Sequence, residues 1–327
     1  MPKPTMTLKQ LAGILNVSVS TISKALNDSP EISDATRARV KEVAHFYNYQ
    51  PNRIAQNLKS GKTNIIALII PSLQNFFFND VLNGIEEALR ETQYHLMINL
   101  TNESSAKEAQ LVETLSHGLV DGLIIAMAEE TQKQQAFDHF SPSKPIVFFD
   151  RIEENLNDFV NIKTNDAIAV ENAVEYLMDK GRSTFALIST IHNLNVGKER
   201  KAGFVKAHNT HEKAIAHDLI LESTKENVSA QTLALLKENK VDGIIALDEE
   251  SSIAAVQACK TLGIERNRDI DVIGYASQKL AENMTPQLST IDQHGDRIGK
   301  ESVQILLDIL QLKDYDLTHI KSELVIR

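Results

Sequence analysis

The alternation of apolar and polar positions in the first fifty residues predicts three short helices. The first begins after Thr7, which makes a capping-box pattern with Gln10, and Asn16 is expected to end it in the left-handed conformation. The second begins at Ser18 and the third at Ser33. The residues predicted to lie on the inner faces are Leu8, Leu11, Ala12, Leu15, Val17, Ile22, Ala25, Leu26, Val40, Val43, Ala44 and Tyr47. Two helices joined by about three residues, with a third packed across them, form a compact helix-turn-helix unit.

From Asn64 onward, short aliphatic runs alternate with segments of helical length. The runs cover residues 64–71, 95–100, 122–127, 145–150, 184–189, 218–223, 243–248, 271–276 and 288–293, and the final "ELVIR" also has the pattern of a strand. Runs that are apolar on both faces and are separated by helices indicate buried parallel strands. The second part of the chain is therefore predicted to be a doubly wound α/β domain.

An internal echo suggests that this domain has two similar lobes. The segment "VDGLIIAMAEE" at Val120 recurs as "VDGIIALDEES" at Val241. In doubly wound folds, ligands bind beyond the carboxyl ends of the strands. Between two such lobes, that place is the cleft.

Composition narrows the class of protein. With 42% hydrophobic and 24% charged residues, the chain of 327 residues is expected to be a soluble globular protein of two or three domains. No apolar run approaches the roughly 20 residues of a membrane helix, and the first residues have no signal-peptide pattern, so a cytoplasmic location is expected. Cys259 is the only cysteine, which excludes an internal disulfide and a cysteine-based zinc cluster.

The charge is distributed unevenly. Residues 1–62 hold nine Lys and Arg against four Asp and Glu, a net charge of +5, while the remainder has a net charge of −15. Only the N-terminal segment can attract a polyanion. This matters for the stretch "NVSVSTISKALN", residues 16–27, which would be the second helix of the helix-turn-helix and carries a face rich in hydroxyl groups. The alternative is a solvated face, but the side chains at the start of such a helix commonly enter the major groove of DNA.

The segments "TLKQLAGILNVSVSTISKALN", "ISDATRARV" and "YNYQPNRIAQNLKSGKT" resemble the N-terminal signature of the lactose-repressor (LacI) family of transcription regulators. The resemblance continues through the two-lobed remainder. It implies a DNA-binding head, a hinge helix and a ligand-binding domain similar to the sugar-binding proteins of the periplasm.

The resemblance assigns DNA contacts to positions in the head. Val19 and Ser20 match the variable pair that sets operator preference, and Thr21 and Ser23 match residues that position phosphates. Lys24 stands where the family has a basic residue that reaches a guanine edge or a phosphate. Thr7, the first N-cap, is included with them. Each base contact would contribute about 1–3 kcal/mol of discrimination.

The segment "PNRIAQNLKSG" matches the hinge helix of the family, which forms when two subunits bind the operator side by side. Leu58 matches the leucine that is wedged into the minor groove, and Asn52, Ala55 and Lys59 match its neighbours. A helix of about eight residues is marginal alone in water, which is consistent with folding on DNA. The alternative is a solvated linker with one stray leucine.

The resemblance also assigns effector contacts at the ends of strands. Phe77 would cover a ring by stacking, Arg151 and Arg200 would donate forks of hydrogen bonds, and Ala126 would leave room. Asp248 and Gln293 complete the predicted set. Two alternatives remain: Phe77 and Phe78 can be core residues, and Arg151 and Arg200 can form surface ion pairs.

One departure from the family concerns the ligand. Ala276 follows Gly274 and Tyr275 where many members have an aspartate that binds ligand hydroxyls, and Asp248 or Glu249 would have to substitute for it. Two arginines with one or two carboxylates suit a sugar, a sugar acid or a sugar phosphate. The sequence does not choose among these three.

We find no catalytic constellation and expect no cofactor. "SGKT" at Ser60 resembles the end of a phosphate loop, but Gln56 stands where the loop needs a glycine. The histidines of "HNTH", His208 and His211, with His217 nearby, suggest a metal site only superficially, and a solvated surface is favoured. No nucleophile elbow is present.

The sequence therefore predicts a non-enzymatic transcription regulator, expected to be a repressor, that binds palindromic double-stranded operator DNA as a homodimer and a small-molecule effector, expected to be a carbohydrate. Its predicted parts are a head (1–50), a hinge (51–62) and an effector-binding domain (63–327), with one lobe at 63–163 and 294–322 and the other at 164–293 and 323–327. The rival functions are a cytoplasmic solute-binding protein and a constitutive DNA binder with a vestigial cleft.

Overall fold

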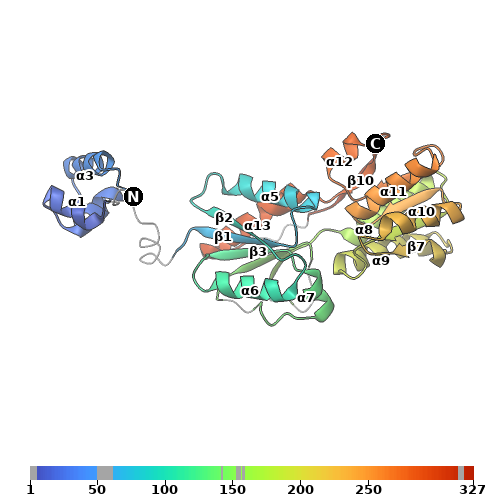
Figure 1. The fold of residues 1–327 in the computed structure, drawn as a ribbon, viewed down its shortest axis with the longest axis horizontal. Coiled ribbons are helices and arrows are strands. Elements are labelled where there is room, and N and C mark those ends of the chain that lie inside the picture. Colours follow the sequence, from blue (N-terminus) through green and yellow to red (C-terminus); the bar gives the residue numbers. More distant parts are fainter. Residues whose placement is uncertain (1–5, 50–61, 141–142, 152–155, 157–158, 316–319) are drawn as a thin grey trace. The chain divides into compact units, whose positions relative to one another are not determined.

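The structure, a computed structural model, describes residues 6–49, 62–140, 143–151, 156, 159–315 and 320–327. The contacts divide the chain into two compact units, Met1–Thr63 and Asn64–Arg327 (Figure 1). In the described residues, no helix is long and apolar enough to cross a membrane.

The first unit has three helices, α1 (Leu8–Leu15), α2 (Val19–Leu26) and α3 (Asp34–Phe46). The predicted capping box between Thr7 and Gln10 is confirmed, and Asn16 ends α1 with φ 55°. Ser18 and Ser33 cap the other two helices through their hydroxyl groups, as predicted. The helices enclose a small core of buried residues: Leu11, Ala12, Leu15, Ile22, Ala25, Val40 and Ala44.

Tyr47 is not in this core, and its predicted burial is wrong. Its side chain is 42% exposed because α3 ends at Phe46. Asn48 then reverses the chain in the left-handed conformation, and the backbone N–H of Tyr49 donates to the carbonyl of Ala44. It is therefore Tyr49 that packs against the core.

The second unit contains two sheets. The first has five parallel strands in the order β2-β1-β3-β4-β5: β1 (Ile65–Ile70), β2 (His95–Leu100), β3 (Gly122–Ile125), β4 (Ile146–Phe149) and β5 (Val160–Ile162). Its helices are α5 (Phe76–Leu89), α6 (Ser105–Ser116), α7 (Glu129–Gln134) and α13 (Gly295–Leu310). Helices α5 and α13 pack on one face, and α6 packs on the other.

The second sheet has the order β11-β10-β9-β8-β6-β7, with only β11 antiparallel to its neighbour: β6 (Phe185–Ser189), β7 (Ile220–Glu222), β8 (Gly243–Ala246), β9 (Asp271–Gly274), β10 (Ser289–Asp292) and β11 (Glu323–Val325). Around it lie α8 (Asp166–Asp179), α9 (Asn195–Thr210), α10 (Val228–Glu238), α11 (Glu249–Leu262), α12 (Gln278–Asn283) and the short 3₁₀ helix η2 (His217–Leu219). Helices α8 and α9 cover one face, and α10 to α12 cover the other. The prediction of mixed α/β architecture with parallel sheets and a helical N-terminal unit is confirmed.

The internal echo corresponds to equivalent places in the two sheets. Asp121, before β3, accepts a hydrogen bond from the backbone of Asn64, just before β1. Asp242, before β8, accepts the backbone N–H groups of Ser183 and Thr184, just before β6. Each aspartate therefore joins the starts of two neighbouring central strands.

Two strands differ from the expectation. The short β5 was not predicted, because it has only three residues and the middle one, Asn161, is polar, which leaves too little pattern. Strand β2 is half-exposed rather than buried on both faces, and Ile98 is 41% exposed. It lies at the edge of the first sheet, where it has a neighbour on one side only.

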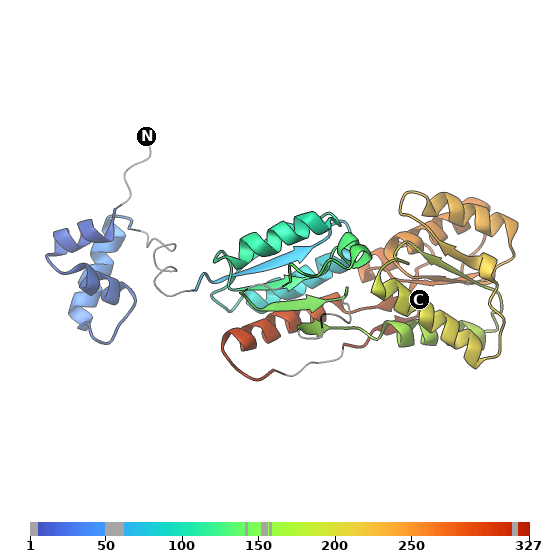
Figure 2. The same cartoon turned by 90° about the horizontal axis from the view of Figure 1, so that it is seen from below.

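The first sheet with its helices forms the first lobe of this unit, and the second sheet with its helices forms the second lobe. The chain passes between the two lobes three times. It leaves the first lobe after β5, returns between β10 and α13, and leaves again between α13 and β11 (Figure 2). The carboxyl ends of β5 and β10 therefore lead directly into the connections, so residues after β10 can face both lobes.

Candidate DNA-binding surface and effector site

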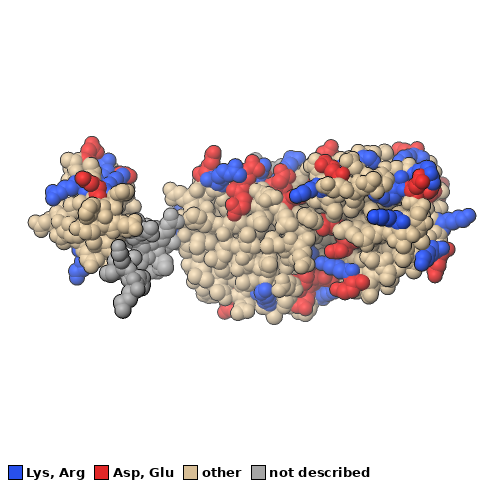
Figure 3. Space-filling model, turned by 45° about the horizontal axis from the view of Figure 1, so that its top comes forward, with Lys and Arg blue, Asp and Glu red and all other residues tan. Residues whose placement is uncertain are grey.

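The first turn of α2 carries the exposed part of the predicted DNA-binding surface. Val19 is 45% exposed and Ser20 is also exposed, although they begin a helix whose other side, Ile22 and Ala25, is fully buried. Figure 3 shows both basic and acidic side chains on the surface of this unit. An apolar methyl next to a small hydroxyl at the start of a helix suits contact with base edges in a major groove.

Thr7, Thr21 and Lys24, which were also predicted to contact DNA, already have partners within the head. The hydroxyl groups of Ser18 and Thr21 hydrogen-bond each other over 2.8 Å, and the hydroxyl of Thr7 serves the capping box. Ser23 is half-buried, and Lys24 forms an ion pair with Glu31. Both members of that pair are well exposed, so it is weak, and a phosphate can replace Glu31.

The predicted hinge contacts Asn52, Ala55, Leu58 and Lys59 lie outside the described residues. They therefore remain predictions from the sequence.

A cavity lies among the carboxyl ends of strands from both sheets, with a volume of about 650 Å³ including the space open to solvent. The residues around it are Asn75, Phe77, Phe78, Asp80, Asp150, Arg151, Ile191, Leu194, Val196, Arg200, Asp248, Glu249, Tyr275, Ala276, Ser277, Ile291, Asp292, Gln293 and Gly295.

The cavity includes Phe77, Arg151, Arg200, Asp248 and Gln293, which are five of the six predicted effector contacts. Ala126 is not among the lining residues: it is fully buried in the core of the first lobe, and its N–H pairs with Ile69. Phe78 belongs to both the core and the wall, whereas Phe77 is half-buried.

Arg151 follows β4 and is held inside the first lobe. Its Nη1 donates to Glu103 over 2.6 Å and to the carbonyl of Met127 over 3.2 Å. Its guanidinium also lies 5.6 Å from the centre of the Phe78 ring. Burial raises the pKa of Glu103, but the charge and hydrogen bond of Arg151 and the N–H of Glu129 bring this pKa below its usual value.

Arg200 is the centre of a buried cluster in the second lobe. Its Nε donates to Asp166 over 2.5 Å, its Nη1 donates to the carbonyl of Leu247 over 2.7 Å, and its guanidinium lies 3.7 Å from the centre of the Tyr275 ring. Arg200 and Arg151 are only 4% and 5% exposed. Both guanidinium groups are therefore buried, and so is the pair of Arg200 with Asp166, while Glu103 is partly exposed; this corrects the alternative of surface pairs.

Asp248 lines the cavity, but its oxygens are already used. They accept the N–H and hydroxyl groups of both Thr190 and Ser251, and the bond to the Ser251 N–H caps α11. Four donors leave little capacity for a ligand. In this arrangement Asp248 shapes the wall of the cavity.

Carboxylates outnumber guanidinium groups around the cavity. Asp80, Asp150, Glu249 and Asp292 accompany Asp248, against two arginines that are both paired with other acids. Burial raises the pKa of Asp80, with help from Asp292 and Asp296, and burial raises that of Asp150 despite the two arginines. Asp150 was missed in the prediction, although it directly follows the strand "PIVFF".

Glu249 gives a testable pH dependence. Burial, with the charges of Glu250, Asp248 and Asp80, raises its pKa to about 7, while the backbone of Phe76 opposes the shift. The folded protein then binds more protons than the unfolded chain between pH 4.5 and about 7, so Glu249 costs stability progressively as the pH rises through this window.

Replacing Glu249 with Gln is therefore expected to raise the melting temperature at pH 8 relative to the wild type, and to give no such gain at pH 4.5. Thermal unfolding at several pH values measures the difference. Glu86→Gln, an exposed carboxyl on α5, is the control and should show no pH-dependent gain. A gain for Glu249→Gln that is equal at both pH values would contradict the assignment.

His208 corrects another expectation. It is 4% exposed rather than solvated, because it lies on the inner face of α9 between Phe185 and Phe204, and burial lowers its pKa. His211 is on the surface. The described residues contain no group of three potential metal ligands.

The two units match two known families. Residues 7–52 match the bacterial regulatory proteins, lacI family, and residues 66–314 match the periplasmic binding protein domain. The chain carries a lacI-family DNA-binding domain. Its larger unit is a periplasmic-binding-protein domain, as the resemblance implied.

Two relatives that match nearly the whole chain are named as repressors. The ribose operon repressor of Haemophilus influenzae is 29% identical, with 92% of this chain and 91% of that protein covered. The transcriptional repressor PurR of Vibrio parahaemolyticus is 27% identical, with 98% and 97% covered. These relatives are transcriptional regulators, so the prediction that the chain is not an enzyme is confirmed.

Solved structures of lacI-family regulators share the fold. A crystal structure of the lac repressor dimer bound to operator and the anti-inducer ONPF has a TM-score of 0.87 and 22% identity, with 99% of this chain and 98% of that chain covered. The complex of the regulator CelR with cellobiose has a TM-score of 0.71 and 21% identity, with 98% and 99% covered. At this identity, the likeness supports the fold alone.

Proposed function

We propose that this regulator is a cytoplasmic repressor that binds palindromic operator DNA as a homodimer, and that a sugar or sugar derivative in the cavity controls its operator affinity. The observation that carries the proposal is the combination in one chain of an exposed recognition turn at Val19 and Ser20 with a cavity lined from both lobes. Relatives with both parts are repressors, and the related lac repressor was solved as a dimer on its operator.

The cavity favours an uncharged ligand with many hydroxyl groups. Phe77 offers an aromatic face for a sugar ring, and Asp80, Asp150 and Glu249 offer acceptors for hydroxyl hydrogens. A phosphate or carboxylate would meet an excess of buried negative charge, since both arginines are already paired. Of the three ligand classes left open by the sequence, a neutral sugar fits best.

The rival functions make different predictions. A solute-binding protein has no use for a recognition helix, and a constitutive DNA binder would not respond to any ligand. Neither accounts for a cavity with buried polar groups in the same chain as a capped helix-turn-helix.

Selection of bound sequences from random duplex DNA by the full-length protein, at physiological salt, tests the proposal. A recovered palindrome supports a dimeric operator-binding protein and supplies a probe for ligands. A panel of neutral sugars, with their acids and phosphates, is then tested for changes in affinity for that probe. No enrichment, with or without the sugar panel, would reject sequence-specific binding.

Leu58→Ala tests the hinge prediction. If Leu58 is wedged between base steps, its loss should lower specific operator affinity by tenfold or more while non-specific affinity changes little, because non-specific binding depends on phosphate contacts. Titrations with operator and with scrambled duplex give both affinities. Equal losses on both duplexes would reject the wedge.

A further inference from the structure

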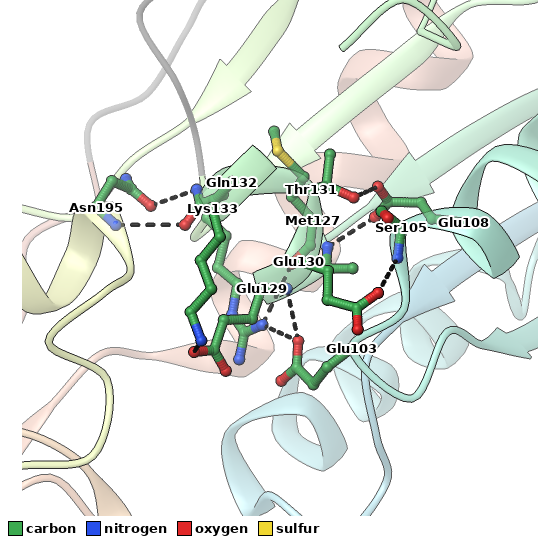
Figure 4. A network of polar contacts seen from close by, with 12 residues as sticks. Glu103, Ser105, Glu108, Met127, Glu129, Glu130, Thr131, Gln132, Lys133 and Asn195 are labelled. Carbon is green, nitrogen blue, oxygen red and sulfur yellow. Dashed lines mark hydrogen bonds and ion pairs between the residues drawn. The ribbon is translucent and has the colours of Figure 1, made fainter. Parts of the chain in front are cut away.

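A polar contact between Gln132 and Asn195 joins the two lobes beside the cavity. Gln132 on α7, in the first lobe, donates its Nε2–H to the side-chain oxygen of Asn195 on α9, in the second lobe, over 2.8 Å. The backbone N–H of Asn195 donates in return to Oε1 of Gln132 over 3.3 Å. Figure 4 shows the two side chains meeting from opposite sides.

This contact supplies a hydrogen-bond acceptor to the first turn of α9. The N–H groups in the first turn of a helix have no partners within the helix, and Leu194, the N-cap of α9, supplies no side-chain acceptor. Gln132 provides that acceptor from the other lobe, and its own side chain is 6% exposed. Separation of the lobes would therefore leave both groups without these partners until water replaced them.

Asn195 adjoins the cavity. Its neighbours in the chain, Leu194 and Val196, both line the cavity. A ligand that presses on either residue therefore acts on the same turn of backbone that donates to Gln132. This is the route from the cavity to the contact on the side of the second lobe.

In the first lobe, Glu103 connects helix α7 to the cavity. Glu103 accepts both the Nη1 of Arg151, a cavity residue, and the backbone N–H of Glu129, the first residue of α7, on the same oxygen Oε2, at 2.6 and 2.8 Å. The fully buried Glu108 holds the same helix by accepting the N–H of Ala128 and the hydroxyl of Thr131 (Figure 4). A ligand that draws Arg151 away from Glu103 would loosen one of these two anchors.

We propose that Gln132 and Asn195 form a latch between the lobes, and that the occupant of the effector cavity controls this latch through Arg151, Glu103 and α7. The inference rests on the proposed function, because it describes how the same cavity would govern the arrangement of the lobes. A ligand shifts that arrangement only as far as it interacts differently with the latched and unlatched states. The two states differ in whether the hydrogen bonds between Gln132 and Asn195 are formed.

The latch is tested in the full-length protein by amide hydrogen exchange of peptides that cover residues 191–199. Gln132→Met keeps the length of the side chain but removes its hydrogen bonds, so exchange in this segment should become at least threefold faster. Lys133→Gln, an exposed position on the same helix, is the matched control and should match the wild type. Unchanged exchange in Gln132→Met would overturn the latch.

A second pair of variants tests the connection to the cavity. Glu103→Gln removes the charge that joins Arg151 to α7, and it should accelerate exchange at residues 191–199 at least twofold while peptides from β6 keep their rate. Glu130→Gln makes the same change on a carboxylate that accepts the N–H of Ser105 but does not contact Arg151, and it should have no effect. Equal effects of the two variants would overturn the connection.

Operator titration separates this inference from the proposed function. Gln132→Met should change affinity for the selected operator at least threefold, in the direction set by which state binds DNA. A latch variant that exchanges faster but binds operator like the wild type would overturn the control of DNA binding by the latch, while operator binding itself would stand. A wild type that selects no operator would reject the proposed function, and the exchange experiments would still decide the latch.

Discussion

Replacing Arg200 with methionine is expected to lower the free energy of unfolding of the larger unit by about 3–5 kcal/mol. The guanidinium of Arg200 is the charged partner of Asp166, which is only 3% exposed and also accepts the hydroxyl of Thr164. Methionine fills a similar volume but leaves this carboxylate buried without its cation. Chemical denaturation of the full-length protein, followed by a signal from the larger unit, measures the loss.

The double variant Arg200→Met with Asp166→Asn is the decisive comparison. It removes both charges, so no ion is left uncompensated, and it should be more stable than the single variant Arg200→Met. Equal instability of the two proteins would mean that packing against Tyr275, and not charge, is what Arg200 supplies. Lys201→Met, at the next position on α9 but in an exposed pair with Glu222, should change stability by about 1 kcal/mol or less.

This result would also define what Arg200 does in the cavity. The residue was predicted to donate to a ligand, and it does line the cavity, but two of its donors already serve Asp166 and Leu247. Loss of the effector response in Arg200→Met would therefore combine lost ligand contacts with a disturbed second lobe. The double variant separates these effects, because it should recover stability without recovering the guanidinium.

The sequence could predict the strands and the head because the signals there are local. Buried parallel strands such as β1 and β8 are apolar on both faces, and turn residues or helices bound them. The three helices of the head are marked by the hydroxyl caps Thr7, Ser18 and Ser33. Where the local signal was short, as in β5, the element was missed.

The residues of the cavity were partly predictable because the carboxyl ends of parallel strands converge. Arg151 and Gln293 lie within two residues of the ends of β4 and β10 and were identified in this way. Their partners were not, since Glu103 and Asp166 lie 48 and 34 positions from the arginines they bind, and no local pattern indicates such pairs. Whether each arginine is free to bind a ligand depends on those partners.

Two predicted contacts show the limits of reasoning from strand ends. Ala126 follows β3 by one residue, but its backbone still pairs with Ile69, so it remains inside the sheet and its side chain is core. Asp248 is at the end of β8 and does face the cavity, yet it is also the N-cap of α11. Aspartate is itself a favoured N-cap residue, so the cap could have been predicted from Asp248 and the helical pattern after it.

Replacing Gly84 with alanine is expected to destabilise the larger unit by about 3 kcal/mol. Helices α5 and α13 touch at this glycine, where a Cβ atom would lie 2.0 Å from the backbone oxygen of Asp296. A backbone atom cannot move aside as a flexible side chain can, so the helices must separate. Thermal or chemical unfolding measures the loss, and Asn83→Ala, an exposed neighbour on α5, is the control and should change stability by no more than about 0.5 kcal/mol.

The separation of α5 from α13 should also change the shape of the effector cavity. Helix α5 carries Phe77 and Asp80, and α13 begins at Gly295, so both sides of this contact contribute to the wall. Gly299→Ala would place a Cβ atom 2.1 Å from the oxygen of Val81 and force the same displacement, so the double variant should lose less stability than the two single losses together. Additive losses would mean that the glycines act independently. Weaker binding of the effector in all three variants, with Asn83→Ala unaffected, would show that the close approach of α5 and α13 sets the shape of the cavity.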